Sequence, residues 1–342
     1  KLAETPDYER KLDTARAWMK DWHFRIGVHH LRGLIDAFEA GKSYADLAEA
    51  VIAALWPVVA AEFALKHGAM PGRGAVILGM GSLGAGRLNA GSDLDLILIY
   101  DPAGAETSEG ARPLPTRTYY ARLTQAMVTA LSAQTAEGRL YEVDVRLRPS
   151  GRQGAVATSI DSFRSYQETE AWTWEHLALT RARVLAGEPS LAAAVEDFRR
   201  QVLADVADMR RRLSEAKPGQ GGWDAKFGPG RLMDIELLAQ TLALQAAIPA
   251  RQVERQIALG AKRPGMSQTD QAALLDAYRL CWRLQCASRL LTDRTVSPAD
   301  LGEGGRGFVL RECGAEGATA LTERLTQAAT LAERVIAAHL QG

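Results

Sequence analysis

The 342-residue sequence has few cysteines, no excess of either charge and no long hydrophobic run, and each shortage argues against a class of protein. Its three cysteines, Cys281, Cys286 and Cys313, form no C-x-x-C pair, so neither a disulfide framework nor a zinc site is expected. We expect small buried side chains in a reduced, cytoplasmic protein. Lys and Arg total 41, as do Asp and Glu, so the basic surplus typical of nucleic-acid-binding proteins is missing.

The longest uncharged apolar run, 50–61, is too short to span a bilayer, and no stretch resembles a secretory signal. Membrane and nucleic-acid partners are therefore not expected. With 47% hydrophobic residues the chain can build a large core, and its length favours two or three structural units. Because the first residue is Lys1 rather than Met, we expect the chain to be part of a longer protein or a shortened version of one.

Most of the sequence predicts helices, because Ala and Leu dominate and apolar residues recur every three or four positions. Two helices are expected first, at 12–40 and 44–66, with a break at 41–43, Ser43 as N-cap and a kink or split at Pro57. Segments 215–231 and 301–307 are predicted to be loops. Further helices are expected at 116–134, 170–185, 189–217, 232–247, 268–293 and 319–340.

Short apolar runs bounded by turn residues predict strands at 75–80, 94–100 and 140–148. From residue 162 onward the pattern is helical to the end. The expected fold class is therefore α+β, mainly helical, with a small mixed sheet and a C-terminal helical bundle. The expected division is helices at 1–70 that pack on the core, an α/β core at 71–160 and the helical bundle at 161–342.

Acidic residues mark two of the predicted strands. In "DLDLILIY" the side chains of Asp93 and Asp95 share one face, because residues two apart on a strand point the same way. In "YEVDVRLR" the polar face holds Glu142, Asp144, Arg146 and Arg148. With the two strands side by side, Asp144 meets Asp93 and Asp95.

Three converging carboxylates repel one another unless a cation lies among them, and hard oxygen ligands suit Mg²⁺. Two such ions would clamp the attacking and leaving oxygens of an in-line displacement at phosphorus. Gly81, twelve residues before Asp93, would let the backbone approach a phosphate closely, and the Ser82 hydroxyl could donate to it. The set predicts a nucleotidyltransferase site.

Gly-Ser, then D-x-D, then a third acid resembles the polymerase-β-like nucleotidyltransferase superfamily. Three longer stretches, "LGMGSLGAGRLNAGSDLDLILIYD", "LYEVDVRLRPSGRQGAVATS" and "EAWTWEHLALTRARVLAG", closely resemble the glutamine synthetase adenylyltransferase family. The resemblance implies an enzyme of two homologous halves. One half removes AMP from glutamine synthetase by phosphorolysis, and the other attaches AMP from ATP to one of its tyrosines. "EAWTWEH" and "RPSGRQG" resemble the second, carboxy-terminal half.

By this resemblance, Asp93, Asp95 and Asp144 are the catalytic residues and hold two Mg²⁺ ions. The residues expected to contact ATP are Gly81, Ser82, Ser92, Arg146 and Arg148. For Arg146 a salt bridge to Asp144 is an equal alternative. The implied protein substrate is glutamine synthetase, and the implied regulators are the PII signalling protein and glutamine, in the control of nitrogen metabolism.

Three alternatives remain: the AMP-removing half, another superfamily enzyme acting on RNA ends or a small molecule, and a non-catalytic fragment that binds glutamine synthetase or PII. The stretch "GPGRLMDIELL" departs from the family pattern, with Arg231 in place of a second glycine and Leu237 in place of Phe. Asp234 and Glu236 within it are explained by a helix start, which favours acids, and a role at the nucleotide site is the alternative. His176 is expected to be a hydrogen-bonded structural residue.

Overall fold

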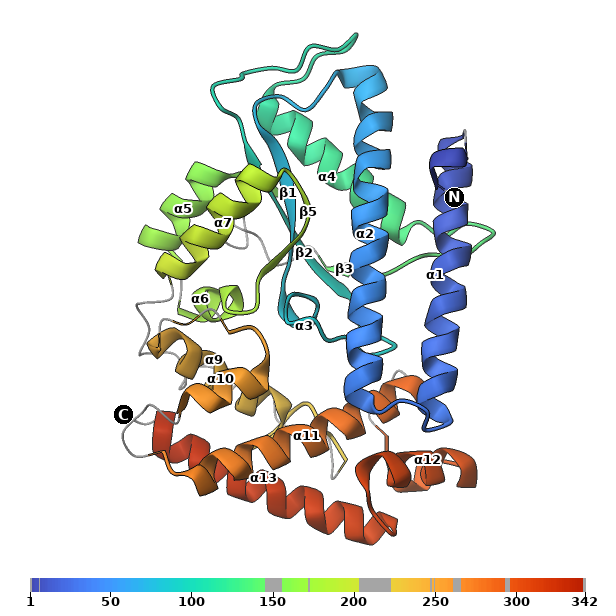
Figure 1. Ribbon diagram of the computed structural model, residues 1–342, viewed down its shortest axis with the longest axis vertical. Coiled ribbons are helices and arrows are strands. Elements are labelled where there is room, and N and C mark those ends of the chain that lie inside the picture. Colours follow the sequence, from blue (N-terminus) through green and yellow to red (C-terminus); the bar gives the residue numbers. More distant parts are fainter. Residues whose placement is uncertain are drawn as a thin grey trace. The chain divides into compact units, whose positions relative to one another are not determined.

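The computed structural model describes residues 2–5, 7–144, 156–171, 173–202, 223–246, 248, 250–260, 266–292 and 296–340. This part of the chain is mainly helical with a small mixed sheet, which confirms the α+β class (Figure 1). The chain forms two compact units. Unit 1 consists of Lys1–Arg25, Ala45–Gly86 and Ser92–Val202, and unit 2 of Ile26–Tyr44, Arg87–Gly91 and Leu203–Gly342.

After a short 3₁₀ turn, η1 (Leu2–Glu4), the chain forms two long helices, α1 (Tyr8–Leu31) and α2 (Ala37–His67). The break between them lies at 32–36, so the predicted break at 41–43 is wrong. Two local signals place it there. Gly33 ends α1 with a φ of 69°, and the Asp36 carboxylate accepts the backbone N–H groups of Phe38 and Glu39, both at 2.9 Å.

The residues expected to interrupt this region lie inside α2. Ser43 is not an N-cap, because its hydroxyl donates to the carbonyl four residues earlier, at 2.8 Å. A Cβ on Gly41 would lie 2.9 Å from side-chain atoms of Arg87 and Trp282, so this glycine serves close packing rather than a turn. The helix also continues through Pro57, so the split considered there does not occur.

Of the described residues, those of α2 form the one helix that is long and apolar enough to cross a membrane. The test considers only length and composition, and a helix in the core of a soluble protein passes it as well. Val51, Ile52 and Leu55 are almost completely buried within the protein, as expected of a core helix.

Unit 1 contains a five-stranded sheet (Figure 1). The strands follow the order β3-β2-β1-β5, and β4 also pairs with β2. β1 is antiparallel to β2 and β5, whereas β3 and β4 run parallel to β2. The bounds are β1 (Gly74–Gly79), β2 (Leu94–Asp101), β3 (Val143–Asp144), β4 (Ala157–Ser159) and β5 (Arg183–Gly187).

The predicted strands at 75–80 and 94–100 are confirmed as β1 and β2, but the helix predicted over 170–185 is wrong at its end. There the chain forms α6 (Thr173–Leu179) and then β5. Residues of β5 pair with β1 along the edge that β2 leaves open, Ala186 opposite Ile77 and Val184 opposite Leu78. An unpaired edge in the core would leave buried backbone groups without partners, and this requirement overrides the local helical pattern.

Helices pack on the sheet of unit 1. Apolar residues of β1 and β2 share a core cluster with α5 (Ile160–Thr169) and α7 (Pro189–Val202), in which Phe163 and Phe198 meet edge to face. Tyr120 of α4 (Thr116–Ser132) stacks on Tyr100 of β2, with ring centroids 4.3 Å apart. The apolar residues of β2 are therefore buried on both faces.

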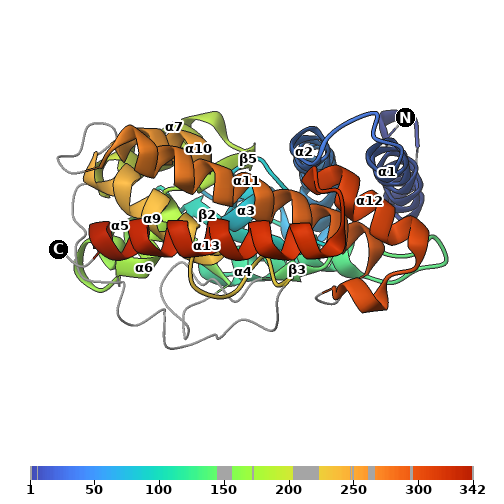
Figure 2. The same ribbon diagram turned by 90° about the horizontal axis from the view of Figure 1, so that it is seen from below.

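Unit 2 is helical in its described part. α11 (Gln268–Leu291) and α13 (Ala318–Leu340) lie side by side (Figure 2). The loop predicted at 301–307 is wrong, because α12 (Glu303–Cys313) begins there and buries Phe308 and Val309. As predicted, all three cysteines are buried. The remaining elements are α9 (Leu232–Gln245), α10 (Val253–Leu259) and the 3₁₀ turn η3 (Pro298–Asp300).

Candidate functional site

A tight turn joins β1 to the rest of the candidate site. Directly after β1 the chain makes one helical turn, α3 (Gly81–Gly84). Gly81 has a φ of 53°, and a Cβ built on it would lie 2.5 Å from Oδ2 of Asp95. Position 81 requires glycine for two reasons: its positive φ and the lack of space for a side chain. The Asp95 carboxylate therefore lies directly against the turn.

Backbone pairing brings a second carboxylate to the same place. β2 and β3 are parallel, and Asp95 is the register partner of Asp144. Paired residues of neighbouring strands project to the same face of a sheet, so the two side chains share one face. The Asp95 carbonyl in turn accepts the N–H of Met80, at 2.9 Å, which ties β2 to the start of the turn. Gly81, Asp95 and Asp144 thus meet at one end of the sheet.

Asp93 lies two residues before Asp95, just outside β2, and is exposed. Ser82, in the turn, and Ser92, beside Asp93, are both half-buried. Within the ranges that the structure describes, no three His, Cys, Asp or Glu side chains are grouped as a metal site requires. The structure therefore brings Asp95 and Asp144 together and leaves Asp93 at the solvent-facing rim.

The donor set still fits Mg²⁺. This ion keeps several waters and is usually held by one or two carboxylates together with substrate phosphates, not by a closed cage of protein ligands. Asp95 and Asp144 supply hard oxygen donors beside a glycine turn where a phosphate chain could approach. Two carboxylates in register also repel each other, and a divalent cation relieves that repulsion.

The far side of the turn rests on the segment before β5. A Cβ on Gly84 would lie 2.1 Å from the carbonyl oxygen of Arg181. Arg183, the first residue of β5, reaches the Leu83 carbonyl with Nη2 at 3.3 Å and Glu49 of α2 with Nη1 at 2.5 Å. The sequence reasoning missed Arg183 and Glu49. Arg183 stands in the quoted stretch "TRARVLAG", but a helix was expected there.

The sequence also singled out two arginines, a histidine and an aspartate outside the glycine turn and the D-x-D pair. Arg146 and Arg148 lie outside the described residues, so their roles remain predictions. His176 Nε2 lies 2.8 Å from the Gln167 carbonyl oxygen, as predicted for a structural histidine. Asp234 is in the first turn of α9 and accepts the N–H of Gly230, at 2.9 Å, which supports its interpretation as a helix-start acid.

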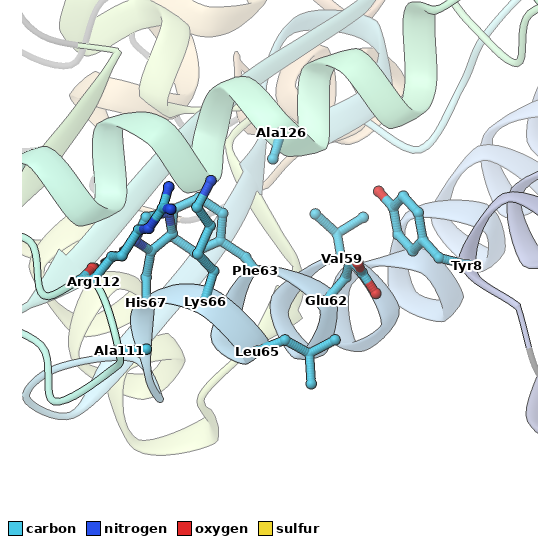
Figure 3. A pocket seen from close by; sticks show the side chains of 10 residues that line it. All are labelled: Tyr8, Val59, Glu62, Phe63, Leu65, Lys66, His67, Ala111, Arg112 and Ala126. Carbon is cyan, nitrogen blue, oxygen red and sulfur yellow. Dashed lines mark hydrogen bonds between the residues drawn. The ribbon is translucent and has the colours of Figure 1, made fainter.

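Unit 1 also has an open cavity of about 650 Å³ near the C-terminal end of α2 (Figure 3). Its polar side chains come from α1, α2 and the segment before α4, and Phe63 and Val59 supply apolar surface. The described candidate site residues do not line this cavity. The lining residues are Tyr8, Val59, Glu62, Phe63, Leu65, Lys66, His67, Ala111, Arg112 and Ala126.

Comparisons with known proteins connect this geometry to a family. A family model described as glutamate-ammonia ligase adenylyltransferase matches residues 1–198. A Mesorhizobium japonicum protein named bifunctional glutamine synthetase adenylyltransferase/adenylyl-removing enzyme is 47% identical over 254 residues, which are 71% of this chain and 26% of that protein. Proteins of the same name are 43% identical in Xanthobacter autotrophicus (91% of this chain, 33% of that protein) and 37% identical in Bradyrhizobium sp. ORS 278 (99% and 36%).

The chain spans about a third of the length of these relatives. The family match covers the glycine turn, the D-x-D pair and Asp144, and the fold brings Gly81, Asp95 and Asp144 together at one end of the sheet. The chain belongs to the glutamate-ammonia ligase adenylyltransferase family.

Proposed function

We propose that this chain transfers AMP from ATP to a tyrosine of glutamine synthetase and releases pyrophosphate, as the adenylylating half of a longer bifunctional enzyme. The observation that carries the proposal is the register pairing of Asp95 with Asp144 beside Gly81. Family membership and the names of the relatives supply the reaction class and the protein substrate.

In this proposal the turn at Gly81 and Ser82 binds the triphosphate of ATP through backbone N–H groups and the Ser82 hydroxyl. Ser92, Arg146 and Arg148 contribute further polar and cationic contacts. Asp93, Asp95 and Asp144 would hold Mg²⁺, which supplies charge neutralisation for the reacting phosphates when bound. Asp93, at the exposed rim, is the carboxylate closest to solvent of the set.

The tyrosine hydroxyl attacks the α-phosphorus of ATP. Its oxygen forms the new bond to phosphorus, and the bond to the bridging oxygen breaks as pyrophosphate leaves. A free tyrosine has a pKa near 10, so its proton must be taken up during the attack. A carboxylate oxygen of Asp144 accepts this proton, and the pairing with Asp95 holds Asp144 in place for the transfer.

The proposal also specifies the direction of the reaction, adenylylation rather than adenylyl removal. The relatives are named for both adenylylation and adenylyl removal. "EAWTWEH" and "RPSGRQG" favour adenylylation, since they resemble the adenylylating half. In the reverse alternative the same site uses phosphate and releases ADP. We propose further that PII and glutamine regulate the enzyme, that it acts in the cytoplasm, and that Mg²⁺ and ATP are required.

The test uses the chain with Mg²⁺, α-labelled ATP and unmodified glutamine synthetase, beside the double variant Asp93→Asn/Asp95→Asn. We expect label on glutamine synthetase with the unmutated chain alone. If neither protein transfers label, adenylylated glutamine synthetase and phosphate are offered instead. ADP release would then identify the removing half, and silence in both assays would favour a fragment that needs the other half of the enzyme or an effector.

A further inference from the structure

We propose that Arg183 is a positioning residue that holds the nucleotide-binding turn in place through the Leu83 carbonyl, with Glu49 fixing the arginine from behind. This inference rests on the proposed function, because it assumes that Gly81–Gly84 binds the phosphates of ATP. It concerns a residue outside the carboxylate set and outside the two sequence motifs that surround that set.

The position of Arg183 follows from the sheet. It is the first residue of β5 and the register partner of Gly79, the last residue of β1. β5 therefore delivers the guanidinium to the point where β1 ends and the turn begins. The arginine side chain is 25% exposed and that of Glu49 is 34% exposed.

One guanidinium serves two partners here. Nη1 pairs with Oε2 of Glu49 at 2.5 Å, and Nη2 donates to the Leu83 carbonyl at 3.3 Å. The planar fork of arginine can hold both partners at once, whereas a single ammonium cannot present two fixed donors in this way. Glu49 thus sets the orientation in which Arg183 meets the turn.

The Leu83 carbonyl matters because a peptide unit is planar. The Leu83 carbonyl and the Gly84 N–H belong to one peptide unit. That N–H closes the turn by donating to the Met80 carbonyl oxygen, at 2.9 Å. On the opposite side, Gly81 lies against the Asp95 carboxylate. Fixing the Leu83 carbonyl therefore fixes where the turn stands relative to Asp95.

A displacement of this turn is expected to act on nucleotide binding more than on stability. Partly exposed ion pairs contribute little to folding free energy. A misplacement of about 1 Å in a positioned group can cost about 100-fold in activity. A purely structural salt bridge would show the opposite balance, with changes in thermal stability and none in ATP affinity.

The experiment measures the Kd for ATP in the presence of Mg²⁺ by titration calorimetry, with the thermal unfolding midpoint of each variant beside it. Arg183→Lys keeps the charge near Glu49 but loses the second donor, and we expect about a 10-fold weaker Kd with an unchanged midpoint. Arg183→Gln is expected to weaken the Kd by about 10- to 100-fold. Glu49→Gln, which leaves the contact to Leu83 possible, should have the smallest effect.

The matched control is Arg73→Gln. Arg73 also forms an arginine–carboxylate pair in unit 1, with Asp101, but at the opposite end of β1 and β2. Its Kd for ATP should equal that of the unmutated chain.

The proposal is overturned if Arg183→Lys and Arg183→Gln bind ATP as the unmutated chain does, or if their Kd changes only together with the unfolding midpoint. It is also overturned if the unmutated chain does not bind ATP. If ATP binding depends on Arg183 while no AMP reaches glutamine synthetase, the role of Arg183 stands and the proposed function fails.

Discussion

Asp95 and Asp144 are register partners in two parallel strands, although they are 49 positions apart in the chain. The pairing gives the site a fixed spacing between two carboxylates that does not depend on a loop. Strand pairing of this kind positions side chains more precisely than loops do. The consequences of this arrangement can be tested residue by residue.

Asp144→Asn should abolish most AMP transfer and leave the fold intact. The amide keeps the shape of the side chain but can neither take up the tyrosine proton nor neutralise a cation. Removing a group that acts in proton transfer costs about 100- to 10,000-fold. The measurement is the initial rate of label incorporation into glutamine synthetase, with circular dichroism as the check on folding.

The control for this variant is Glu142→Gln. Glu142 lies two residues earlier, and its carboxylate forms an ion pair with Arg139, in which both side chains are about half exposed. An equal loss of activity in both variants would contradict a specific role for Asp144.

Gly81→Ala should disrupt the site more than Gly86→Ala. Both glycines have positive φ values, 53° and 74°, so alanine introduces similar backbone strain of about 1 kcal/mol at each. The surroundings differ, because a Cβ at Gly81 would meet Asp95 whereas a Cβ at Gly86 has no atom within 4 Å.

We therefore expect Gly81→Ala to lose more stability than Gly86→Ala, and Gly81→Ala alone to lose ATP affinity, by about 100-fold. Urea unfolding and calorimetric titration of ATP with Mg²⁺ measure the two effects. Equal Kd values for the two variants would refute the close contact between the turn and Asp95.

Two glycine-to-alanine substitutions within helices should change stability in opposite directions. Alanine favours a helix interior by about 1 kcal/mol over glycine. At Gly304 in α12 the added Cβ meets no atom within 4 Å, so we expect a gain of up to about that size. At Gly41 the Cβ would collide with Arg87 and Trp282, and we expect a loss of about 1–3 kcal/mol. The measurement is the free energy of unfolding in urea of each variant and of the unmutated chain. A stabilising Gly41→Ala would show that α2 is not closely packed there.

The cysteines should make the fold sensitive to alkaline pH. Burial raises the pKa of the Cys281 thiol to about 11 and that of Cys313 to about 12, and burial likewise raises the pKa of Cys286. Each folded-state pKa is above the unfolded value, so this stabilisation is fully present below the unfolded pKa and is lost as pH rises through the folded pKa. We expect the free energy of unfolding to begin falling above about pH 8.5 and to continue falling through about pH 11.

The companion measurement is thiol labelling. At pH 8 the native chain should react with a thiol reagent many times more slowly than the urea-unfolded chain, because buried thiols carry little thiolate. Rapid labelling of the native chain would contradict the burial of all three cysteines.

Local sequence patterns predicted the two strands that carry the candidate site. β1 and β2 were found from apolar runs between glycine-rich turns, and Asp95 is among the first residues of β2 while Asp93 directly precedes the strand. Signals that act over a few residues determine these features. The same holds for Asp234 at the start of α9, which accepts a backbone N–H of the preceding turn.

Long-range packing decided the features that were missed. Nothing local in "RVLAG" identifies a strand; β5 forms because β1 has an edge to pair. Gly41 looked like a helix end because glycine usually marks one, but here it makes room for two side chains distant in sequence. The break at 32–36, in contrast, had local signals in Gly33 and Asp36 that a stricter reading of helix caps would have found.

The place of β1 between β2 and β5 also bears on how the molecule forms. β1 can pair with β2 soon after both are synthesised. The pairing of Gly79 with Arg183 forms only after β5 has been synthesised, roughly a hundred residues later. Closing so long a loop is entropically costly, and pairings of this kind form slowly. The turn at Gly81–Gly84 is therefore expected to acquire its final shape late in folding, after the pairing of β1 with β2 is complete.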